Sequence, residues 1–363
     1  MAPQRKTSEE GADSPAKRMK LGPILRTEFA RVVPPASAST LKIVSINVAG
    51  LRSVLDEDRP ADKRAALASL VASESPDVLC LNEHKLKKQD VKASVEKLKA
   101  LLPGYSRAAF SCSGPPAKKG YSGVAILIKD GGAVPKDAEI VEGMPEVERA
   151  SKDSIIAHEG RLLTLKLPDH KLCVISTYAP NSGQDLRRLG YRTEDKGWDQ
   201  TMAEYVMALK NMWGTEVAVI GDLNCCIRAH DIHNMYTRPN FSELCDGSIP
   251  IEDQYTGLSS IKKTPGITIE ERRSFGKMLH EAGLVDSFRS QHPDATGIFS
   301  YYSQRIAANR DANKGLRLDY VLVTSGLLSD EAQTKLIDSF ILSDDDTPQL
   351  ADHTPVGATF LLR

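Results

Sequence analysis

A short apolar segment with a polar end stands in the middle of the chain: Glu216-Val217-Ala218-Val219-Ile220-Gly221-Asp222-Leu223-Asn224. Its apolar run is typical of a strand that is buried on both faces. Gly221 ends the run, and Asp222 and Asn224 follow it. Because residues i and i+2 of an extended chain point to the same side, a carboxylate and an amide project together from the end of this strand. Open sheets bind ligands at such strand ends, so the pair is a candidate site unless it only begins a loop or caps a helix.

The composition is that of a globular protein with a large core. The chain has 363 residues, of which 41% are hydrophobic and 26% are charged. The formal net charge of −1 does not attract nucleic acid by itself, so such binding needs a local basic face. We expect no membrane segment and no secretory signal, because no apolar run is long enough for either. The six cysteines form no CxxC pair, which favours buried thiols in a reducing compartment, and the vicinal pair Cys225-Cys226 alone makes a poor metal site.

The N-terminal part differs in composition from the rest. Residues 1–38 are rich in Ser, Ala, Pro, Lys and Glu, and we expect a disordered tail there, followed by one domain over residues 39–363. A basic cluster in the tail, Lys17 to Lys20, predicts a nuclear address or is a solvated charge run.

Apolar runs and helical periodicity predict an α/β fold in which two β-sheets pack face to face with helices outside. The predicted strands cover residues 41–48, 78–81, 124–128, 161–167, 171–177, 217–220, 298–303, 316–324, 337–342 and 356–362. The predicted helices cover 61–73, 89–102 and 198–213, and a fourth begins after Thr268 with a capping-box pattern to Glu271 and ends near Gly283. Residues 236–265 form a long irregular segment, which is either functional or disordered.

Polar residues recur where these apolar runs end. If the two sheets bring the strand ends to one edge, the residues form a single site with an excess of carboxylates, which suits Mg²⁺ with a few protein ligands and several waters. The residues are Asn47, Glu83, Tyr178, Asp222, Asn224, Asp319, Asp352 and His353.

Each of these residue types has a part in metal-assisted hydrolysis of a phosphoester. Glu83 is the expected main metal ligand, and Asp222 is the expected base or positioning group for a water. Asn47 and Asn224 hold that water or a phosphate oxygen without adding charge. His353 donates to a phosphate oxygen if Asp319 holds its other ring nitrogen, and Tyr178 supplies a hydroxyl. The alternatives are a surface histidine, a structural aspartate and a packing tyrosine.

Eight segments in order resemble those of the exonuclease III-type apurinic/apyrimidinic (AP) endonucleases, within the endonuclease/exonuclease/phosphatase superfamily. The resemblance runs from about residue 41 to residue 362 and implies a four-layer α/β sandwich with two mixed β-sheets. The segments are Ser45–Arg52 (SINVAGLR), Leu81–Lys85 (LNEHK), Gly120–Val124 (GYSGV), Glu159–Arg161 (EGR), Tyr178–Gly183 (YAPNSG), Gly221–Asn224 (GDLN), Arg317–Tyr320 (RLDY) and Asp352-His353.

The resemblance also implies roles for individual residues. It places Asn47, Glu83, Asp222, Asn224, Asp352 and His353 around the metal, which is Mg²⁺ with Mn²⁺ as a substitute. It assigns catalysis to Tyr178, Asp222, Asn224, Asp319 and His353. It gives contacts with DNA to Tyr121, Lys85, Asn181, Gln184, Asn234, Tyr301, Leu316 and Arg317.

Members of this family cut the phosphodiester on the 5′ side of an abasic sugar in duplex DNA. They leave a 3′-hydroxyl and a 5′-deoxyribose phosphate, and they trim blocked 3′ ends to varying degrees. The resemblance therefore implies a monomeric enzyme of base excision repair that works with other proteins of that process. A sugar without a base has little stacking to lose on extrusion, and a small apolar pocket then excludes sugars that still carry a base.

Four departures from the family pattern stand in the sequence. Ala49 replaces a frequent Asp that holds metal-bound water, and Leu316 replaces a frequent Trp of the pocket wall. Gln184 stands where some relatives insert an Arg into the duplex, and the segment 236–265 is longer than usual. Two other functions remain open: a phosphodiesterase acting on phosphoinositides, sphingolipids or RNA tails, and a non-catalytic scaffold.

Overall fold

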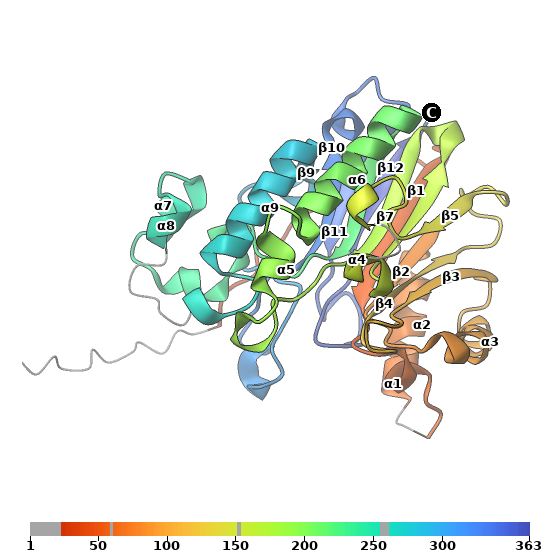
Figure 1. The fold of residues 1–363 in the computed structure, drawn as a ribbon, viewed down its shortest axis with the longest axis horizontal. Coiled ribbons are helices and arrows are strands. Elements are labelled where there is room, and N and C mark those ends of the chain that lie inside the picture. The colour runs from red at the N-terminus through yellow and green to blue at the C-terminus, as the bar shows by residue number, and fades with distance from the viewer. Residues whose placement is uncertain (1–22, 59–60, 151–153, 255–260) are drawn as a thin grey trace, which may run out of the picture.

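Two six-stranded β-sheets face each other in the computed structural model, which describes residues 23–58, 61–150, 154–254 and 261–363 (Figure 1). The first sheet has the order β11-β12-β1-β2-β4-β3, and the second has the order β5-β6-β7-β8-β10-β9. The strands of the first are β1 Thr40–Asn47, β2 Val78–Asn82, β3 Arg107–Cys112, β4 Gly123–Ile128, β11 Thr334–Ile341 and β12 Val356–Leu362. Those of the second are β5 Glu139–Glu142, β6 Leu162–Leu167, β7 Leu172–Tyr178, β8 Glu216–Asp222, β9 Leu284–Asp286 and β10 Asp319–Thr324.

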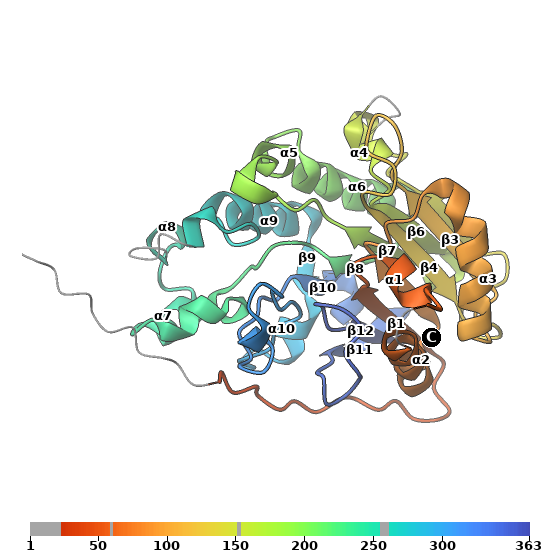
Figure 2. The same ribbon diagram turned by 90° about the horizontal axis from the view of Figure 1, so that it is seen from below.

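Helices cover the outer face of each sheet, which gives the expected four-layer α/β sandwich (Figure 2). The first sheet packs against α1 Leu51–Leu55, α2 Asp62–Glu74 and α3 Val91–Leu101. The second packs mainly against α6 Trp198–Trp213 and α9 Ile269–Ala282. The shorter helices are α4 Ile155–His158, α5 Leu189–Thr193, α7 Phe241–Asp246, α8 Ile251–Gln254 and α10 Ser287–Gln291.

Strand β8 lies in the interior of the second sheet, as its apolar run predicts. Ala218 and Ile220 pack into the cluster between the two sheets, whereas Val217 and Val219 pack outward against α6. Gly221 has φ of 139°, and a Cβ there would lie 2.0 Å from the carbonyl oxygen of Thr177. Only glycine fits this position, and it allows the chain to turn Asp222 toward the strand ends.

Strand directions bring the predicted polar residues to one edge. β1 is parallel to β2, and β7 is parallel to β8, so the residues at their carboxyl ends lie at the same level. β10 and β12 run antiparallel to β8 and β1, so the residues that begin these strands lie at that edge as well. Asp319 is paired directly with Asp222. The expected convergence of strand ends from the two sheets is therefore confirmed.

Several predicted elements are confirmed and some are wrong. Helix α6 and strand β12 have the predicted bounds, and α9 begins with the predicted capping box between Thr268 and Glu271. Strands β3, β5 and β9 were not predicted. The predicted strand at 298–303 is wrong, because within it only Tyr301 forms isolated β-bridges. Among the described residues, no helix has the length and apolar character needed to span a membrane.

Residues 23–38 differ from the expected disordered tail, because they lie along the domain (Figure 2). Ile24 is buried against Phe299 and Tyr302. Arg31 pairs with Asp338 at 2.7 Å and with Glu74 at 3.3 Å. Residues 24 and 31 therefore contact the domain, and the basic cluster at 17–20 falls outside the described residues. All six cysteines are free thiols.

Candidate active site

A cavity of about 750 Å³ opens at the edge where the strand ends of both sheets meet. Its walls come from segments that are far apart in the sequence, between residues 83 and 353. Predicted site residues that line it are Glu83, Tyr178, Asn181, Gln184, Asp222, Asn224, Asn234, Tyr301, Leu316, Asp352 and His353.

Asp222 lines this cavity and is held by amide groups of Asn47 and Asn224. Nδ2 of Asn47 donates to its Oδ2 at 2.9 Å, and the backbone N–H of Asn224 donates to its Oδ1 at 2.8 Å. Nδ2 of Asn224 is 3.3 Å from the same Oδ2. Asn47 itself is buried and does not line the cavity, and its side chain also hydrogen-bonds with Glu83. These contacts fix the carboxylate in one orientation.

His353 faces Asp222 from the other side. Its Nδ1 lies 2.7 Å from Oδ2 of Asp319, and its Nε2 lies 3.9 Å from Oδ2 of Asp222. The Oγ of Ser300 donates to the same oxygen of Asp319 at 2.7 Å. The expected contact between Asp319 and His353 is therefore present. Ser300 was not predicted, and one sequence carries no pattern that singles it out.

Charges in this group alter one another's protonation. Burial and the nearby carboxylate of Asp319 raise the pKa of Asp222 above the usual range of an aspartate. Burial disfavours the charged form of His353, but Asp319 and Asp222 outweigh it and raise the pKa of the imidazole. The two buried carboxylates therefore favour the charged form of the imidazole.

Glu83 and Asp352 are carboxylates that line the same cavity. Burial opposes the charge on Glu83, but Nζ of Lys85, at 2.8 Å from its Oε1, outweighs burial and lowers the pKa of Glu83. Oδ1 of Asp352 is buried and has no hydrogen-bond partner among the described residues. An orphaned carboxylate oxygen and an ionised glutamate in one cavity are groups that could hold a divalent cation.

Asp222, Asp319 and His353 are a second set of residues that lie close enough together to bind a metal ion. Ligand atoms of Asp222, Asp319 and His353 lie within 4.8 Å of one another. However, the Oδ2 of Asp319 already accepts from Ser300 and contacts His353. Glu83 and Asp352 are therefore another pair of carboxylates that could hold a metal ion. Ala49 offers only a methyl group, and its N–H donates to Oδ1 of Asn47 at 2.9 Å.

Tyr178 lines the same cavity, and its hydroxyl hydrogen-bonds with Glu83. Burial and the charge of Glu83 raise the pKa of its hydroxyl well above the usual range. The guanidinium of Arg161 lies 4.9 Å from the centre of its ring, and an Nη of Arg161 donates to its carbonyl oxygen. Tyr178 is therefore a neutral hydroxyl donor with a fixed ring.

An apolar wall lies beside these polar groups. Tyr301 and Leu316 exchange backbone hydrogen bonds of 2.9 Å, and Leu318 lines the cavity two residues further on. Isolated bridges join Ile232 to Leu316, Leu316 to Tyr301, and Tyr301 to His353. The backbone of the apolar wall is thus connected, through Tyr301, to the backbone of His353.

The remaining predicted residues differ in position. Asn181 donates to Oδ1 of Asn224 at 2.9 Å, and Gln184 and Asn234 lie in the cavity wall. Tyr121 is 40% exposed outside the cavity, and its hydroxyl accepts from Arg188 at 2.7 Å. Lining residues that were not predicted include His233, Arg305 and Lys314.

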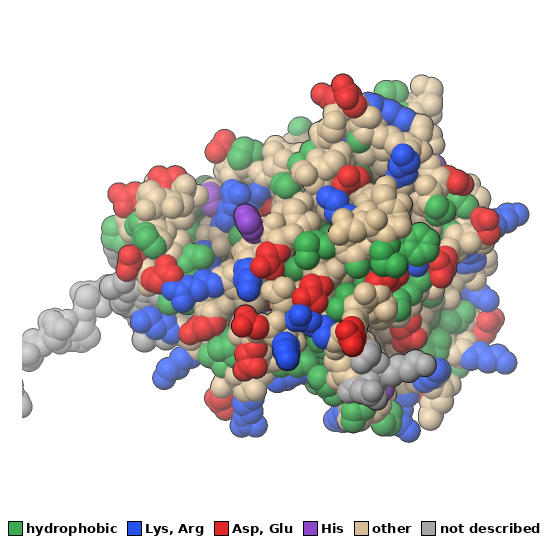
Figure 3. All heavy atoms as spheres, turned by 45° about the horizontal axis from the view of Figure 1, so that its top comes forward, with side chains coloured by type: hydrophobic (Ala, Val, Ile, Leu, Met, Phe, Trp, Pro, Cys, Tyr) green, Lys and Arg blue, Asp and Glu red, His purple; other side chains and the backbone are tan. Residues whose placement is uncertain are grey.

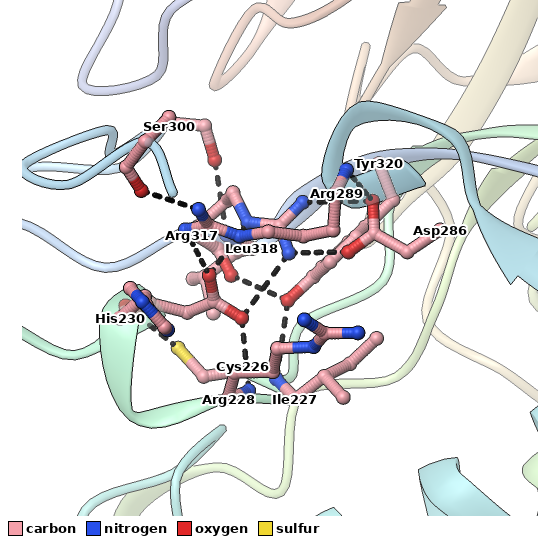
Figure 4. Close-up of polar contacts among 12 residues, drawn as sticks. Cys226, Ile227, Arg228, His230, Asp286, Arg289, Ser300, Arg317, Leu318 and Tyr320 are labelled. Carbon is pink, nitrogen blue, oxygen red and sulfur yellow. Dashed lines mark hydrogen bonds and ion pairs between the residues drawn. The ribbon is translucent and has the colours of Figure 1, made fainter. Parts of the chain in front are cut away.

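Arg317 was expected to contact DNA, and this expectation is wrong. Its side chain is fully buried and pairs with Asp231 and Asp286 (Figure 4). Because alternate residues of an extended chain point to opposite sides, Leu316 and Leu318 face the cavity while Arg317 points away from it.

Comparisons with known proteins identify the family of this chain. The sequence profile described as the Endonuclease/Exonuclease/phosphatase family matches residues 44–344. An exodeoxyribonuclease of Streptococcus pneumoniae is 30% identical over 319 residues, covering 87% of this chain and 98% of the relative. A DNA-(apurinic or apyrimidinic site) endonuclease of Dictyostelium discoideum is 30% identical over 329 residues, covering 89% of this chain and 72% of the relative.

Relatives with full-length coverage and a solved structure extend the comparison. DNA repair nuclease APEX1 of Danio rerio is 29% identical over 370 residues, with 98% of each chain covered. The crystal structure of the AP endonuclease LMAP from Leishmania major is similar to this fold with a TM-score of 0.70, 28% identity and 93% coverage of both chains. The expected resemblance to AP endonucleases is confirmed, and the chain belongs to the endonuclease/exonuclease/phosphatase family.

Proposed function

We propose that this chain is a Mg²⁺-dependent DNA repair endonuclease that hydrolyses the phosphodiester on the 5′ side of an abasic site in duplex DNA. One observation carries the proposal. Asp222 and His353, each held by buried partners, face each other in a cavity whose adjoining wall is apolar. The names of the relatives support the same substrate, since they include AP endonucleases.

The residues present divide the reaction among themselves. Asp222 takes a proton from the attacking water, whose oxygen forms a bond to phosphorus. Nε2 of His353 and the hydroxyl of Tyr178 donate to the non-bridging phosphate oxygens, where negative charge grows. The bond from phosphorus to the 3′ oxygen breaks, and that oxygen takes up a proton to become a 3′-hydroxyl. The 5′ phosphate stays on the abasic sugar.

Glu83 and Asp352 would hold the metal ion, which would neutralise charge on the phosphate and the leaving oxygen. Mg²⁺ suits these oxygen ligands, and Mn²⁺ is a possible substitute. Lys85 contacts Glu83 in this structure, so binding of the ion would compete with that ion pair. Metal binding is therefore expected to free the Lys85 ammonium for a DNA phosphate.

Phosphate contacts around the cavity come from cations rather than from overall charge. On the face shown in Figure 3, basic and acidic side chains are interspersed. Lys263, Arg305 and Lys314 line the cavity, where they would bind backbone phosphates. Such contacts predict binding that weakens steeply with salt.

Further aspects of the proposal go beyond the catalytic step. Trimming of blocked 3′ ends is a second activity, which the similarity to exodeoxyribonucleases favours. We also propose a monomer that acts with other base excision repair proteins, and a nuclear location directed by Lys17 to Lys20.

A paired substrate assay tests the proposed function. One duplex carries a single stable abasic analogue, and the matched duplex is intact. Each is incubated with Mg²⁺ or with a chelator. We expect cutting only at the analogue and only with metal. Equal cutting of both duplexes would indicate a general nuclease, and no cutting of either would indicate the non-catalytic scaffold.

A further inference from the structure

Four charged side chains form a buried cluster (Figure 4), and one of them, Arg317, lies between two residues of the apolar cavity wall. We call the residues Asp231, Asp286, Arg289 and Arg317 the ion cluster. Arg317 donates from Nε to Oδ1 of Asp231 at 2.8 Å and from Nη1 to Oδ1 of Asp286 at 3.2 Å. Arg289 donates to the same Oδ1 of Asp231 at 3.1 Å. Its members come from three separate segments of the chain, because Asp286 and Arg289 both lie where β9 leads into α10.

The ion cluster is neutral in sum and almost inaccessible to water. Asp231 and Arg317 are 0% exposed, Arg289 is 2% and Asp286 is 8%. Burial raises the pKa of a carboxylate, but the two arginines outweigh it and hold the pKa of Asp231 below its usual range. Removing four charges from water is costly, and apolar residues in such a place often give equal or greater stability. The cluster is therefore better explained by the geometry it imposes.

That geometry is imposed on the cavity wall through the backbone. Arg317 stands between Leu316 and Leu318, which both line the cavity. Its N–H donates to the carbonyl oxygen of Asp231 at 2.9 Å, and the next residue, Ile232, is bridged to Leu316. The guanidinium of Arg317 also hydrogen-bonds Asp286 at the end of β9, so it links the segments around Asp231 and Arg317 to that strand.

The same set of backbone contacts extends to His353. Leu316 is bridged to Tyr301, and Tyr301 is bridged to His353. Oγ of Ser300 accepts from the N–H groups of Leu318 and Asp319 at 2.9 Å each. A shift of Arg317 would therefore move both the apolar wall and the group that holds His353.

We propose that the ion cluster is a positioning device that sets the width of the pocket between Leu316, Leu318 and His353, so that the pocket admits a sugar without a base and excludes a complete nucleotide. Arg317 is its central positioning residue and has no contact with DNA. The inference rests on the proposed function, because the pocket is taken to receive the abasic sugar.

A mismatched nucleotide in duplex DNA can be used to measure how strongly the pocket excludes a complete nucleotide. Base flipping is cheapest where pairing is already lost, so exclusion by the pocket is the main remaining barrier to cutting at a mismatch. The measurement is the ratio of cutting rates at an abasic analogue and at a mismatched nucleotide in the same duplex. For Arg317→Met we expect this ratio to fall by about tenfold or more, since a misplacement of about 1 Å alters rates by roughly a hundredfold.

Controls separate positioning from general loss of stability. Arg31→Met breaks an ion pair with Asp338, a carboxylate as buried as that of Asp231 but not part of the cavity lining. This variant should therefore leave the ratio of cutting rates unchanged. Thermal unfolding defines a temperature at which each variant is folded. If Arg317→Met does not fold, Asp286→Asn removes one charge while keeping an oxygen that can cap α10, and the ratio should fall in it as well.

A double variant tests whether Arg317 acts through the wall. Leu316→Ala alone should widen the pocket and lower the ratio, and adding Arg317→Met should lower it little further. Folded Arg317→Met and Asp286→Asn proteins that keep the wild-type ratio would overturn the inference. If the wild-type protein does not cut the abasic duplex, the proposed function fails instead, so the two failures are distinct.

Discussion

Nδ1 of His353 lies 2.7 Å from Oδ2 of Asp319, which leaves Nε2 of the same ring 3.9 Å from Asp222. Asp319 begins β10 and pairs with the last residue of β8, while His353 precedes β12 in the other sheet. This contact therefore joins the two sheets at the candidate active site. It also fixes which nitrogen of the imidazole faces the cavity.

Substitution of Asp319 by Asn should impair catalysis more than DNA binding. The amide cannot stabilise a charged imidazole, so His353 loses its proton more readily and donates less well to the phosphate. We expect kcat to fall by roughly 10²- to 10⁴-fold, the range of general acid–base catalysis, with little change in the Kd for abasic duplex. Single-turnover kinetics and equilibrium binding measure the two quantities. Asp344→Asn, at an exposed ion pair, is the matched control, and equal losses in both variants would contradict the assigned role.

Substitution of Glu83 by Gln should weaken metal binding. The neutral amide removes one of the two carboxylate charges proposed to hold the ion; the other belongs to Asp352, whose buried Oδ1 lacks a partner among the described residues. The Mg²⁺ concentration for half-maximal cutting should rise by about 10- to 100-fold, a range seen when support of a metal site is lost. Calorimetric titration with Mg²⁺ in the absence of DNA gives an independent readout. An unchanged Mg²⁺ dependence, equal to that of the exposed control Glu96→Gln, would remove Glu83 from the metal site.

Acid should destabilise the protein partly through Asp231. Its folded pKa lies below the unfolded value of about 3.9, so its contribution to stability is present above that pH and is lost as the pH falls toward the folded pKa. Asp231→Asn should lower the free energy of unfolding by about 3–5 kcal/mol at pH 7, because it leaves two buried arginines underpaired. Between pH 5 and pH 3 (about the window set by these values), urea unfolding should show a weaker pH dependence in this variant. Identical slopes in both proteins would refute the ion-pair account.

Residues 23–38 should contribute to stability rather than act as a free tail. Arg31 pairs with the buried carboxylate of Asp338, and its guanidinium lies 3.3 Å from the centre of the Phe340 ring. Arg31→Met should lower the free energy of unfolding by about 1–3 kcal/mol, the cost of leaving a buried polar group underpaired. Chemical denaturation measures this change, with the exposed Lys99→Met as control. A loss no larger than that of the control would mean that the contact is not formed in solution.

The sequence predicted those elements whose hydrophobic pattern is compatible with only one kind of secondary structure. The apolar run of β8 is buried on both faces, and α6 has a helical period that matches its buried side. Strand β5 was missed because it is a short edge strand with exposed glutamates at both ends. The apolar pattern at 298–303 did not form a strand, because Tyr301 instead bridges Leu316 and His353.

In the candidate site, likewise, some residues could be predicted from the sequence and others could not. Residue type and position at strand ends were enough to collect Glu83, Asp222 and His353 in one cavity. The burial of Arg317 depends on Asp231 and Asp286, which are 86 and 31 residues away, and no local pattern reports these pairings. Ser300 shows its role only through its hydrogen bond to Asp319.

The most direct test of the central claim is the single-turnover rate at which Asp222→Asn cuts an abasic duplex in saturating Mg²⁺. Asp222, our proposed general base, is held by Asn47 and Asn224, and the isosteric amide keeps the shape of the side chain while removing the basic group. We predict a rate lower by roughly 10³-fold or more, with DNA binding retained. A variant that binds the duplex and cuts it at nearly the wild-type rate would contradict the account.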